Sequence, residues 1–130
     1  FVGVVTATSF VGDVTGDVTG NLNLSNGAVS SATATTTTTS QTAVDTFAAA
    51  TYRSVKYQIQ ITRGSEYHIT EVFIVHDGTT SYGTEYATIK TGSSLASFDT
   101  DIDSGNVRLL ATPTSSSSTV FKLVRTLIKV

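Results

Sequence analysis

The stretch of sequence that decides the fold spans residues 53–78 and reads RSVKYQIQITRGSEYHITEVFIVHDG. Residues 54–61 alternate polar and apolar side chains, a period of two that is typical of a half-buried β-strand. A turn signal follows at residues 63–65, and residues 67–75 form a second run that is apolar on both faces near its end. Asp77-Gly78 then predicts a hairpin with a type I′ turn, in which both central residues need positive φ. The stretch therefore predicts an antiparallel sheet.

Further strands are expected downstream of this stretch, at residues 82–90, 95–102, 107–112 and 120–129, with Gly83 marking a bulge. Short strands at short intervals, without helical periodicity, predict an antiparallel β-sandwich or jelly-roll-like domain over residues 47–130. One short helical turn is compatible with residues 43–50. The fold class is therefore predicted to be all-β.

Alternation also assigns the buried face of this domain. The predicted core consists of apolar residues at alternating strand positions: Val55, Ile59, Ile61, Phe73, Val75, Leu109 and Leu123. Tyr57 and Tyr67 fall with these core residues. Tyr82 and Tyr86 instead share a face with threonines, so we expect them at the surface, where tyrosine rings suit packing on a host-surface glycan. His68 and His76 are expected at the surface or in turns.

Towards the N-terminus the chain carries a repeat of four residues, which reads GDVTGDVTGNLN over residues 12–23. In an extended strand an even period keeps each repeated position on one face. The apolar face comprises Phe10, Gly12, Val14, Gly16, Val18, Gly20 and Leu22. A lone strand cannot bury such a face, so residues 1–27 are predicted to pack against copies of the same segment as an intertwined shaft, in which the glycines permit close backbone approach. A flexible glycine-rich linker is the alternative.

Residues 28–46 are a Ser/Thr-rich tract that connects the repeat to the domain. Threonine is compatible with a strand, but such a uniform tract does not specify a register. Both a strand and an ordered linker therefore remain open for this connector.

Composition excludes several classes of function. Charged residues make up 14% of the 130 residues and the formal net charge is -2, so no basic patch favours nucleic acid or an anionic membrane. The sequence contains no cysteine, and no run approaches the ~18 apolar residues of a membrane span, so we expect a soluble chain without disulfides. Because it begins with Phe1 and lacks methionine, we expect a processed product or the end of a longer polypeptide.

Residues that support chemistry are sparse. His68 and His76 lie too far apart along one strand to bind a single metal, and no nucleophile motif surrounds any serine. The string from Asp99 through Asp101 to Asp103 is similar to a calcium loop, but Ser104 and Leu110 stand where that loop needs glycine and glutamate. On a strand the three aspartates would share one solvent face. We therefore expect no catalytic residue, no metal and no cofactor.

Residues 10–21, FVGDVTGDVTGN, resemble the Gly-Asp/Asn-Val-Thr repeats of tail-fibre and virion structural proteins in large tailed phages, especially those that infect marine cyanobacteria. The strings at residues 52–57, 75–80 and 107–110 look like the C-terminal domain carried by such proteins. The resemblance implies that the shaft closes as a homotrimer, that the chain lies in the virion with other virion proteins, and that it takes part in host attachment. It supplies no catalytic residues.

Two functional hypotheses follow. In the first, the chain is a non-enzymatic structural component of a phage appendage, a fibre whose terminal domain caps the shaft. In the second, it is a capsid or tail decoration protein that clamps neighbouring subunits. A glycan-degrading enzyme is a distant third.

Overall fold

A computed structural model of the chain describes residues 12–13, 15–17 and 19–130. Within that range the regular structure consists of antiparallel strands, and no helix occurs there. The strands are β1 (Leu22–Leu24), β2 (Gly27–Thr36), β3 (Thr42–Ala48), β4 (Tyr52–Arg63), β5 (Glu66–His76), β6 (Ser81–Lys90), β7 (Ala96–Asp103), β8 (Asn106–Pro113) and β9 (Thr119–Lys129). The prediction of an all-β fold is confirmed. Among the described residues there is consequently no helix that could cross a membrane.

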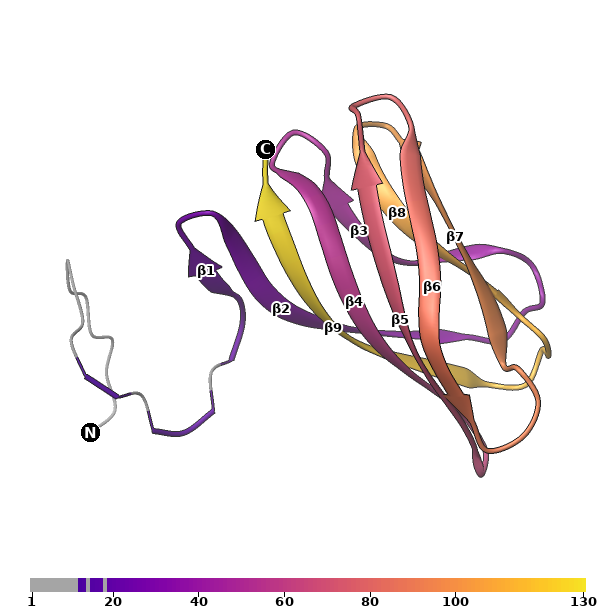
Figure 1. Cartoon of the computed structure of the whole chain (residues 1–130). Coiled ribbons are helices and arrows are strands. Elements are labelled where there is room, and N and C mark those ends of the chain that lie inside the picture. Colours follow the sequence, from indigo (N-terminus) through magenta and orange to yellow (C-terminus); the bar gives the residue numbers. More distant parts are fainter. Residues whose placement is uncertain (1–11, 14, 18) are drawn as a thin grey trace.

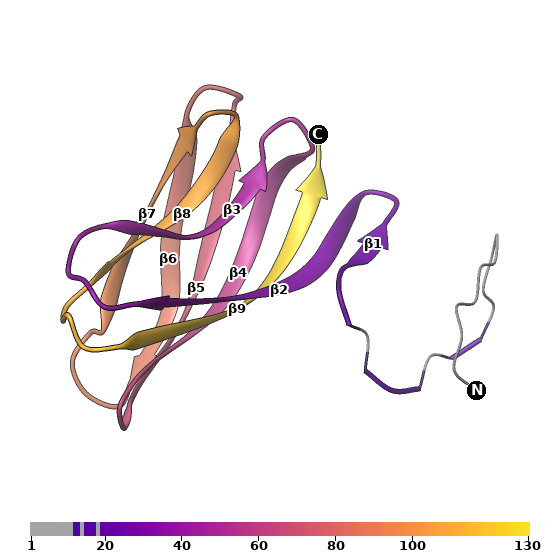
Figure 2. The ribbon, with the colours of Figure 1, turned by 180° about the vertical axis from the view of Figure 1, so that it is seen from behind.

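The strands form two sheets that pack face to face as a sandwich (Figure 1). The larger, six-stranded sheet has the order β1-β2-β9-β4-β5-β6, and the smaller, three-stranded sheet has the order β3-β8-β7. Figure 2 shows the smaller sheet in front of the larger one. The last strand, β9, inserts between β2 and β4, so the larger sheet is complete only when the C-terminal strand is in place.

The core fills the space between the two sheets. On β4, alternation buries Val55, Tyr57, Ile59 and Ile61, each at most 1% exposed. Phe121, Leu123 and Leu127 of β9 and Val107, Leu109 and Ala111 of β8 complete the centre of this cluster. Burial of each large apolar side chain stabilises the fold by roughly 1.5–3 kcal/mol. The predicted core positions Val55, Ile59, Ile61, Leu109 and Leu123 are confirmed.

The predicted face of β5 is wrong. Phe73 and Val75 are 46% and 47% exposed, and Tyr67, expected beside them in the core, is also exposed. The pairing of β5 with β4 decides the face, because Ile74 lies opposite the buried Val55. Alternation could not show this, since the strand is apolar on both faces at its end.

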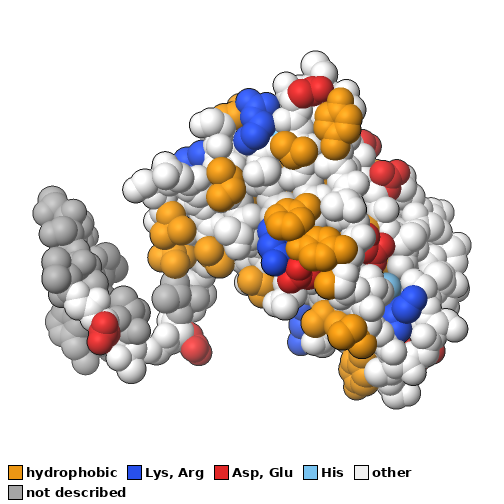
Figure 3. All heavy atoms as spheres, viewed as in Figure 1, with side chains coloured by type: hydrophobic (Ala, Val, Ile, Leu, Met, Phe, Trp, Pro, Cys, Tyr) orange, Lys and Arg blue, Asp and Glu red, His pale blue; other side chains and the backbone are white. Residues whose placement is uncertain are grey.

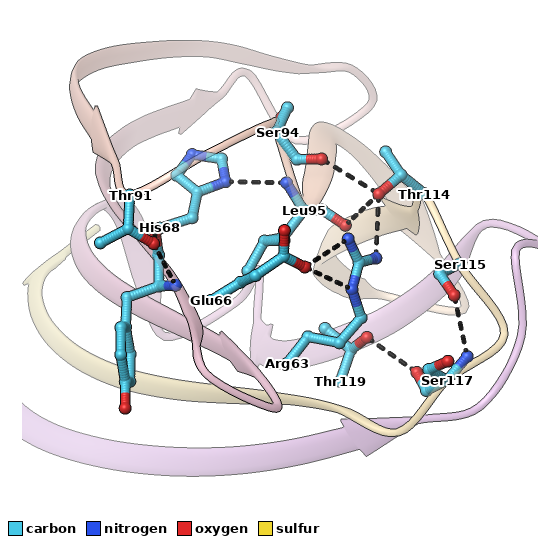
Figure 4. Close-up of polar contacts among 11 residues, drawn as sticks. Arg63, Glu66, His68, Thr91, Ser94, Leu95, Thr114, Ser115, Ser117 and Thr119 are labelled. Atoms are coloured by element: carbon cyan, nitrogen blue, oxygen red, sulfur yellow. Dashed lines mark hydrogen bonds and ion pairs between the residues drawn. The ribbon is translucent and has the colours of Figure 1, made fainter.

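The same choice of face buries both histidines, which were expected at the surface or in turns. His68 is 1% exposed, and its Nδ1 accepts a hydrogen bond from the Leu95 amide at 3.4 Å (Figure 4). His76 is 3% exposed, and its Nε2 donates to the Tyr52 carbonyl at 2.7 Å. Burial lowers the pKa of His68, and nearby Glu85 opposes that shift. Both rings therefore serve as core residues with a backbone partner.

The Ser/Thr-rich tract belongs to the sandwich. Residues 27–36 form β2 and pair with β9 along their whole length, and Gly27 approaches Leu127 so closely that an added Cβ would lie 2.1 Å from the Leu127 carbonyl oxygen. Residues 42–48 form β3 instead of the short helical turn, with a register shift between Ala43 and Asp45. The open choice between strand and linker is resolved in favour of strands, and the folded unit begins well before residue 47.

Turn chemistry differs from the prediction in detail. The loop between β5 and β6 spans residues 77–80, and φ of Asp77 is not positive. The prediction of a type I′ turn at Asp77-Gly78 is therefore wrong. Both central residues of the turn between β7 and β8 do have positive φ, 51° at Ser104 and 79° at Gly105. The irregularity of β6 lies at Ala87, with φ of 54°, rather than at Gly83.

A largely buried polar cluster links the two sheets. Asp45, on the smaller sheet, accepts hydrogen bonds from the Tyr57 hydroxyl at 2.9 Å and from the Arg125 guanidinium. Arg125 also donates to Ser30 Oγ at 2.8 Å, so three strands of the larger sheet meet β3 here. Burial and then the Asp45 carboxylate raise the pKa of Tyr57. The cluster satisfies a charge that would otherwise be costly inside the sandwich.

Candidate functional site

The feature that stands out for function is the outer face of the larger sheet, the side turned away from the smaller sheet. Eleven large hydrophobic side chains are well exposed in the described part of the chain: Leu22, Leu24, Tyr67, Ile69, Phe73, Val75, Tyr82, Ile89, Val124, Ile128 and Val130. Strand pairing places the first ten on this one face, and Val130 directly follows β9. Figure 3 shows hydrophobic side chains gathered over β4–β6 and beside β1. Exposed apolar surface of this extent marks an interaction site.

The hydrophobic residues form two patches at opposite sides of the sheet. We call the first the aliphatic patch, which comprises Leu22, Leu24, Val124 and Ile128 on β1 and β9. We call the second the hairpin patch, which comprises Tyr67, Ile69, Phe73, Val75, Tyr82, Tyr86 and Ile89 on β5 and β6. Polar residues of β4, among them Gln58 and Gln60, lie between the patches.

Charges on this face are few. Lys56 and Glu71 form an ion pair at 3.1 Å, and Lys122 is the remaining charged side chain among the described residues of the face. The Tyr86 hydroxyl and then the Lys56 ammonium lower the pKa of Glu71. The Glu71 carboxylate in turn raises the pKa of Lys56. The face is therefore close to neutral, and its one carboxylate is already paired.

The two tyrosines predicted as a receptor surface, Tyr82 and Tyr86, both lie on this face. The Tyr86 ring stacks on the Phe73 ring with centroids 5.5 Å apart. The Lys56 ammonium lies 5.7 Å from the Phe73 centroid. Tyr82 is 55% exposed and its hydroxyl donates to Asp77 Oδ2 at 3.2 Å. The Phe73 and Tyr86 rings therefore engage each other, and binding of a glycan at Tyr82 and Tyr86 stays a prediction.

Asp77 shapes the loop at the end of the hairpin patch. Its Oδ1 accepts hydrogen bonds from the backbone amides of Thr79 and Thr80, each at 2.8 Å. These amides lower the pKa of Asp77. The carboxylate therefore holds a compact turn, and its role is structural.

The predicted oligomerisation residues are only partly described. Phe10, Val14 and Val18 lie outside the described residues. Leu22 is on β1 and is 51% exposed. Gly12, Gly16 and Gly20 have φ of 145°, 120° and 110°, values that L side chains rarely adopt. They lie at bends, so the expected regular strand is not seen in the described repeat residues, and positive φ explains the glycine at every fourth position.

The outer face of the smaller sheet carries the aspartate string. Asp99, Asp101 and Asp103 share that face, as predicted, and lead into the turn at Ser104. Arg108, opposite Asp101, contacts two of these carboxylates and lowers the pKa of Asp101. Within the part of the chain that the structure describes, no three His, Asp or Glu side chains converge as a metal site would need.

Sequence reasoning missed most of the apolar outer face. The available signal was that β9, which reads TVFKLVRTLIK, carries apolar residues on both faces. Phe121, Leu123 and Leu127 lie on one face, and Val120, Val124 and Ile128 lie on the other. Such a strand is buried on one face and in need of a partner on the other. The same signal was present at the end of β5.

Comparisons with known proteins add structural likeness only. No protein-family model matches the sequence, and no curated protein matches it either. The crystal structure of the Acinetobacter baumannii phage AM24 tailspike protein is similar over 78% of this chain, with a TM-score of 0.45 and 8% identity. The tailspike protein of Acinetobacter phage vB_ApiP_P1 is similar over 89% of this chain, with a TM-score of 0.44 and 13% identity. The chain spans 26% and 24% of these two proteins, and likeness at this level assigns no function to it.

Proposed function

We propose that this chain is a non-enzymatic structural component of a phage virion appendage. In this proposal the sandwich is the terminal domain of a fibre, the N-terminal repeat forms a shaft with other copies of the chain, and the appendage as a whole takes part in host attachment. Its partners are further copies, as a homotrimer, and other virion proteins, with no role for nucleic acid or membrane insertion.

The observation that carries the proposal is the concentration of exposed apolar side chains on one face of the domain, directly beside the repeat. The repeat leads into β1, whose Leu22 and Leu24 are 51% and 49% exposed and begin the aliphatic patch. A domain that leaves this much apolar surface uncovered is suited to assembly. The resemblance of residues 10–21 to virion repeats supports the same reading.

The alternative is a decoration protein that clamps neighbouring capsid or tail subunits. An arm that leaves the domain at β1 would serve such a clamp equally well (Figure 1). The two roles differ in where the repeat inserts. A density map of the intact particle that carries this chain distinguishes them, since a fibre places the repeat on a rotational axis between copies.

The shaft is tested on the full chain with Val14→Asp combined with Val18→Asp. Asp side chains at these positions would bring like charges together in an apolar contact between copies, where unpaired charge is costly, so the trimer should dissociate while the sandwich stays folded. The matched control is Asp13→Ser combined with Asp17→Ser, which should retain the trimer. Mass photometry reads both variants. A monomeric wild-type chain, or a Val-to-Asp variant that remains trimeric, contradicts the shaft.

A further inference from the structure

The outer face of the larger sheet is more apolar than a free surface needs to be. Ten large side chains, each between 38% and 71% exposed, present on the order of 1,000 Å² of accessible surface, compared with about 800 Å² per partner in a typical stable interface. The face as a whole is therefore comparable in area to one side of a typical interface. The question is which partner covers it.

We propose that a second copy of this chain covers it, with the aliphatic patch of one copy packed on the hairpin patch of its neighbour. The inference deepens the proposed structural function and rests on it. It adds a contact between folded domains, which uses one patch from each copy and reinforces the contact through the repeat without replacing it.

Charge supports a partner of the same sequence. The aliphatic patch holds no charged residue, and the single carboxylate of the hairpin side, Glu71, is already paired with Lys56. Apart from Lys122, this face therefore brings no unpaired charge to a contact between two copies. The outer face of the smaller sheet is different, because Asp99, Asp101 and Asp103 share it with only Arg108, and two such faces would repel each other.

The chemistry of the two patches favours contact between unlike patches. Branched side chains such as Leu24 and Ile128 form the aliphatic patch, and they lie in one row because Gly27 pairs with both positions. The hairpin patch supplies rings, with Phe73 and Tyr82 about half exposed. Aromatic residues anchor interfaces when they are packed against apolar partners. Because the patches lie at opposite sides of one sheet, a pairing of unlike patches covers both in every copy of a closed assembly.

The location of the repeat fits this arrangement. The repeat enters the domain at β1, within the aliphatic patch. A neighbour that covers this patch lies beside the point where the repeat leaves the domain. Contacts through the repeat and through the sheet face would then belong to one assembly and reinforce each other.

The test uses two full-length double variants. The aliphatic-patch variant carries Val124→Glu and Ile128→Glu, and the hairpin-patch variant carries Phe73→Glu and Tyr82→Glu. Each should weaken self-association at least tenfold in sedimentation equilibrium. When the two variants are mixed in equal amounts, heterodimers of one variant with the other should form. In such a heterodimer the intact aliphatic patch of one variant still contacts the intact hairpin patch of the other. The matched control, Thr46→Glu with Ser97→Glu, alters exposed residues of the smaller sheet and should leave association unchanged.

Circular dichroism checks that each variant is folded. Where a glutamate variant does not fold, Val124→Thr with Ile128→Thr and Phe73→Thr with Tyr82→Thr replace it, since threonine keeps β propensity. Patch variants that associate as strongly as the wild-type chain overturn the inference. If the Val14→Asp and Val18→Asp double variant is nevertheless dissociated, the proposed shaft is retained without the contact between domains. Either patch variant that forms dimers by itself also overturns it, because like patches would then pair. A monomeric wild-type chain overturns both the inference and the proposed self-association.

Discussion

The two outer faces of the sandwich differ sharply. The larger sheet exposes ten large hydrophobic side chains and three charged ones, whereas the smaller sheet exposes three aspartates and Arg108 around few apolar residues. Both faces belong to antiparallel sheets of one domain and share one core. The fold therefore does not require an apolar outer face, since the smaller sheet is built without one. The hydrophobic residues of the larger face are therefore best explained by contact with another molecule.

The largest expected effect separates the two faces of a single strand. Ile74 is 2% exposed and faces the core, whereas the adjacent Phe73 is 46% exposed on the outer face. Ile74→Ala should lower the free energy of unfolding by about 2–5 kcal/mol through lost burial and a cavity. Phe73→Ala should lower it by less than about 1 kcal/mol in the separated chain. Chemical denaturation measures both, and a larger loss from Phe73→Ala than from Ile74→Ala would show that β5 is turned the other way.

The second prediction contrasts a carboxylate between the sheets with one on the outer face of the smaller sheet. Asp45→Ala leaves Arg125 and the Tyr57 hydroxyl without their shared partner, so the free energy of unfolding should fall by about 2–4 kcal/mol. Asp101→Ala removes an exposed ion pair with Arg108 and should cost less than about 1 kcal/mol. Thermal unfolding of the two variants checks the order. A greater loss from Asp101→Ala would contradict the central role of the buried cluster.

The fold class, most strands and most of the core could be predicted from the sequence because β4 alternates strictly between apolar and polar residues. The buried face of β5 could not be predicted, since Val72, Phe73, Ile74 and Val75 are apolar on both faces and only pairing with β4 decides between them. The Ser/Thr-rich tract became β2 because β9 offers it a complete partner, which is information that a uniform tract does not contain. For the candidate site, Tyr82 and Tyr86 were found by alternation, but their neighbours Phe73 and Val75 were assigned to the core.

The third prediction concerns the sign of the pH dependence. Burial lowers the pKa of His68 in the folded chain, so the unfolded chain binds the proton more readily. The stabilising contribution of neutral His68 is complete above the unfolded pKa of about 6.5 and is lost as the pH falls below it. The melting temperature should therefore fall between pH 7.5 and pH 5.5. His68→Gln should flatten the dependence of the melting temperature on pH. If that dependence is unchanged in the variant, groups other than His68 cause it.

The smallest expected effect concerns the turn between β7 and β8, at the edge of the charged face. Gly105 has φ of 79°, which a side chain disfavours, although no atom lies within 4 Å of an added Cβ. Gly105→Ala should therefore lower the free energy of unfolding by about 1 kcal/mol through backbone strain alone. Ser104, with φ of 51°, offers the opposite change, and Ser104→Gly should raise stability slightly. Melting temperatures that move in the other direction would contradict a type I′ turn.

The most direct test of the central claim, that another copy covers the outer face of the larger sheet, uses the absence of native cysteine. A single Val124→Cys or Ser97→Cys substitution places one thiol on the larger or the smaller sheet of the full-length chain. The rate of reaction with a thiol reagent is measured as the protein concentration rises. The thiol at position 124 should become protected at high concentration, while the thiol at position 97 should react at a constant rate. Reaction rates that stay constant at both positions would show that no other copy covers this face.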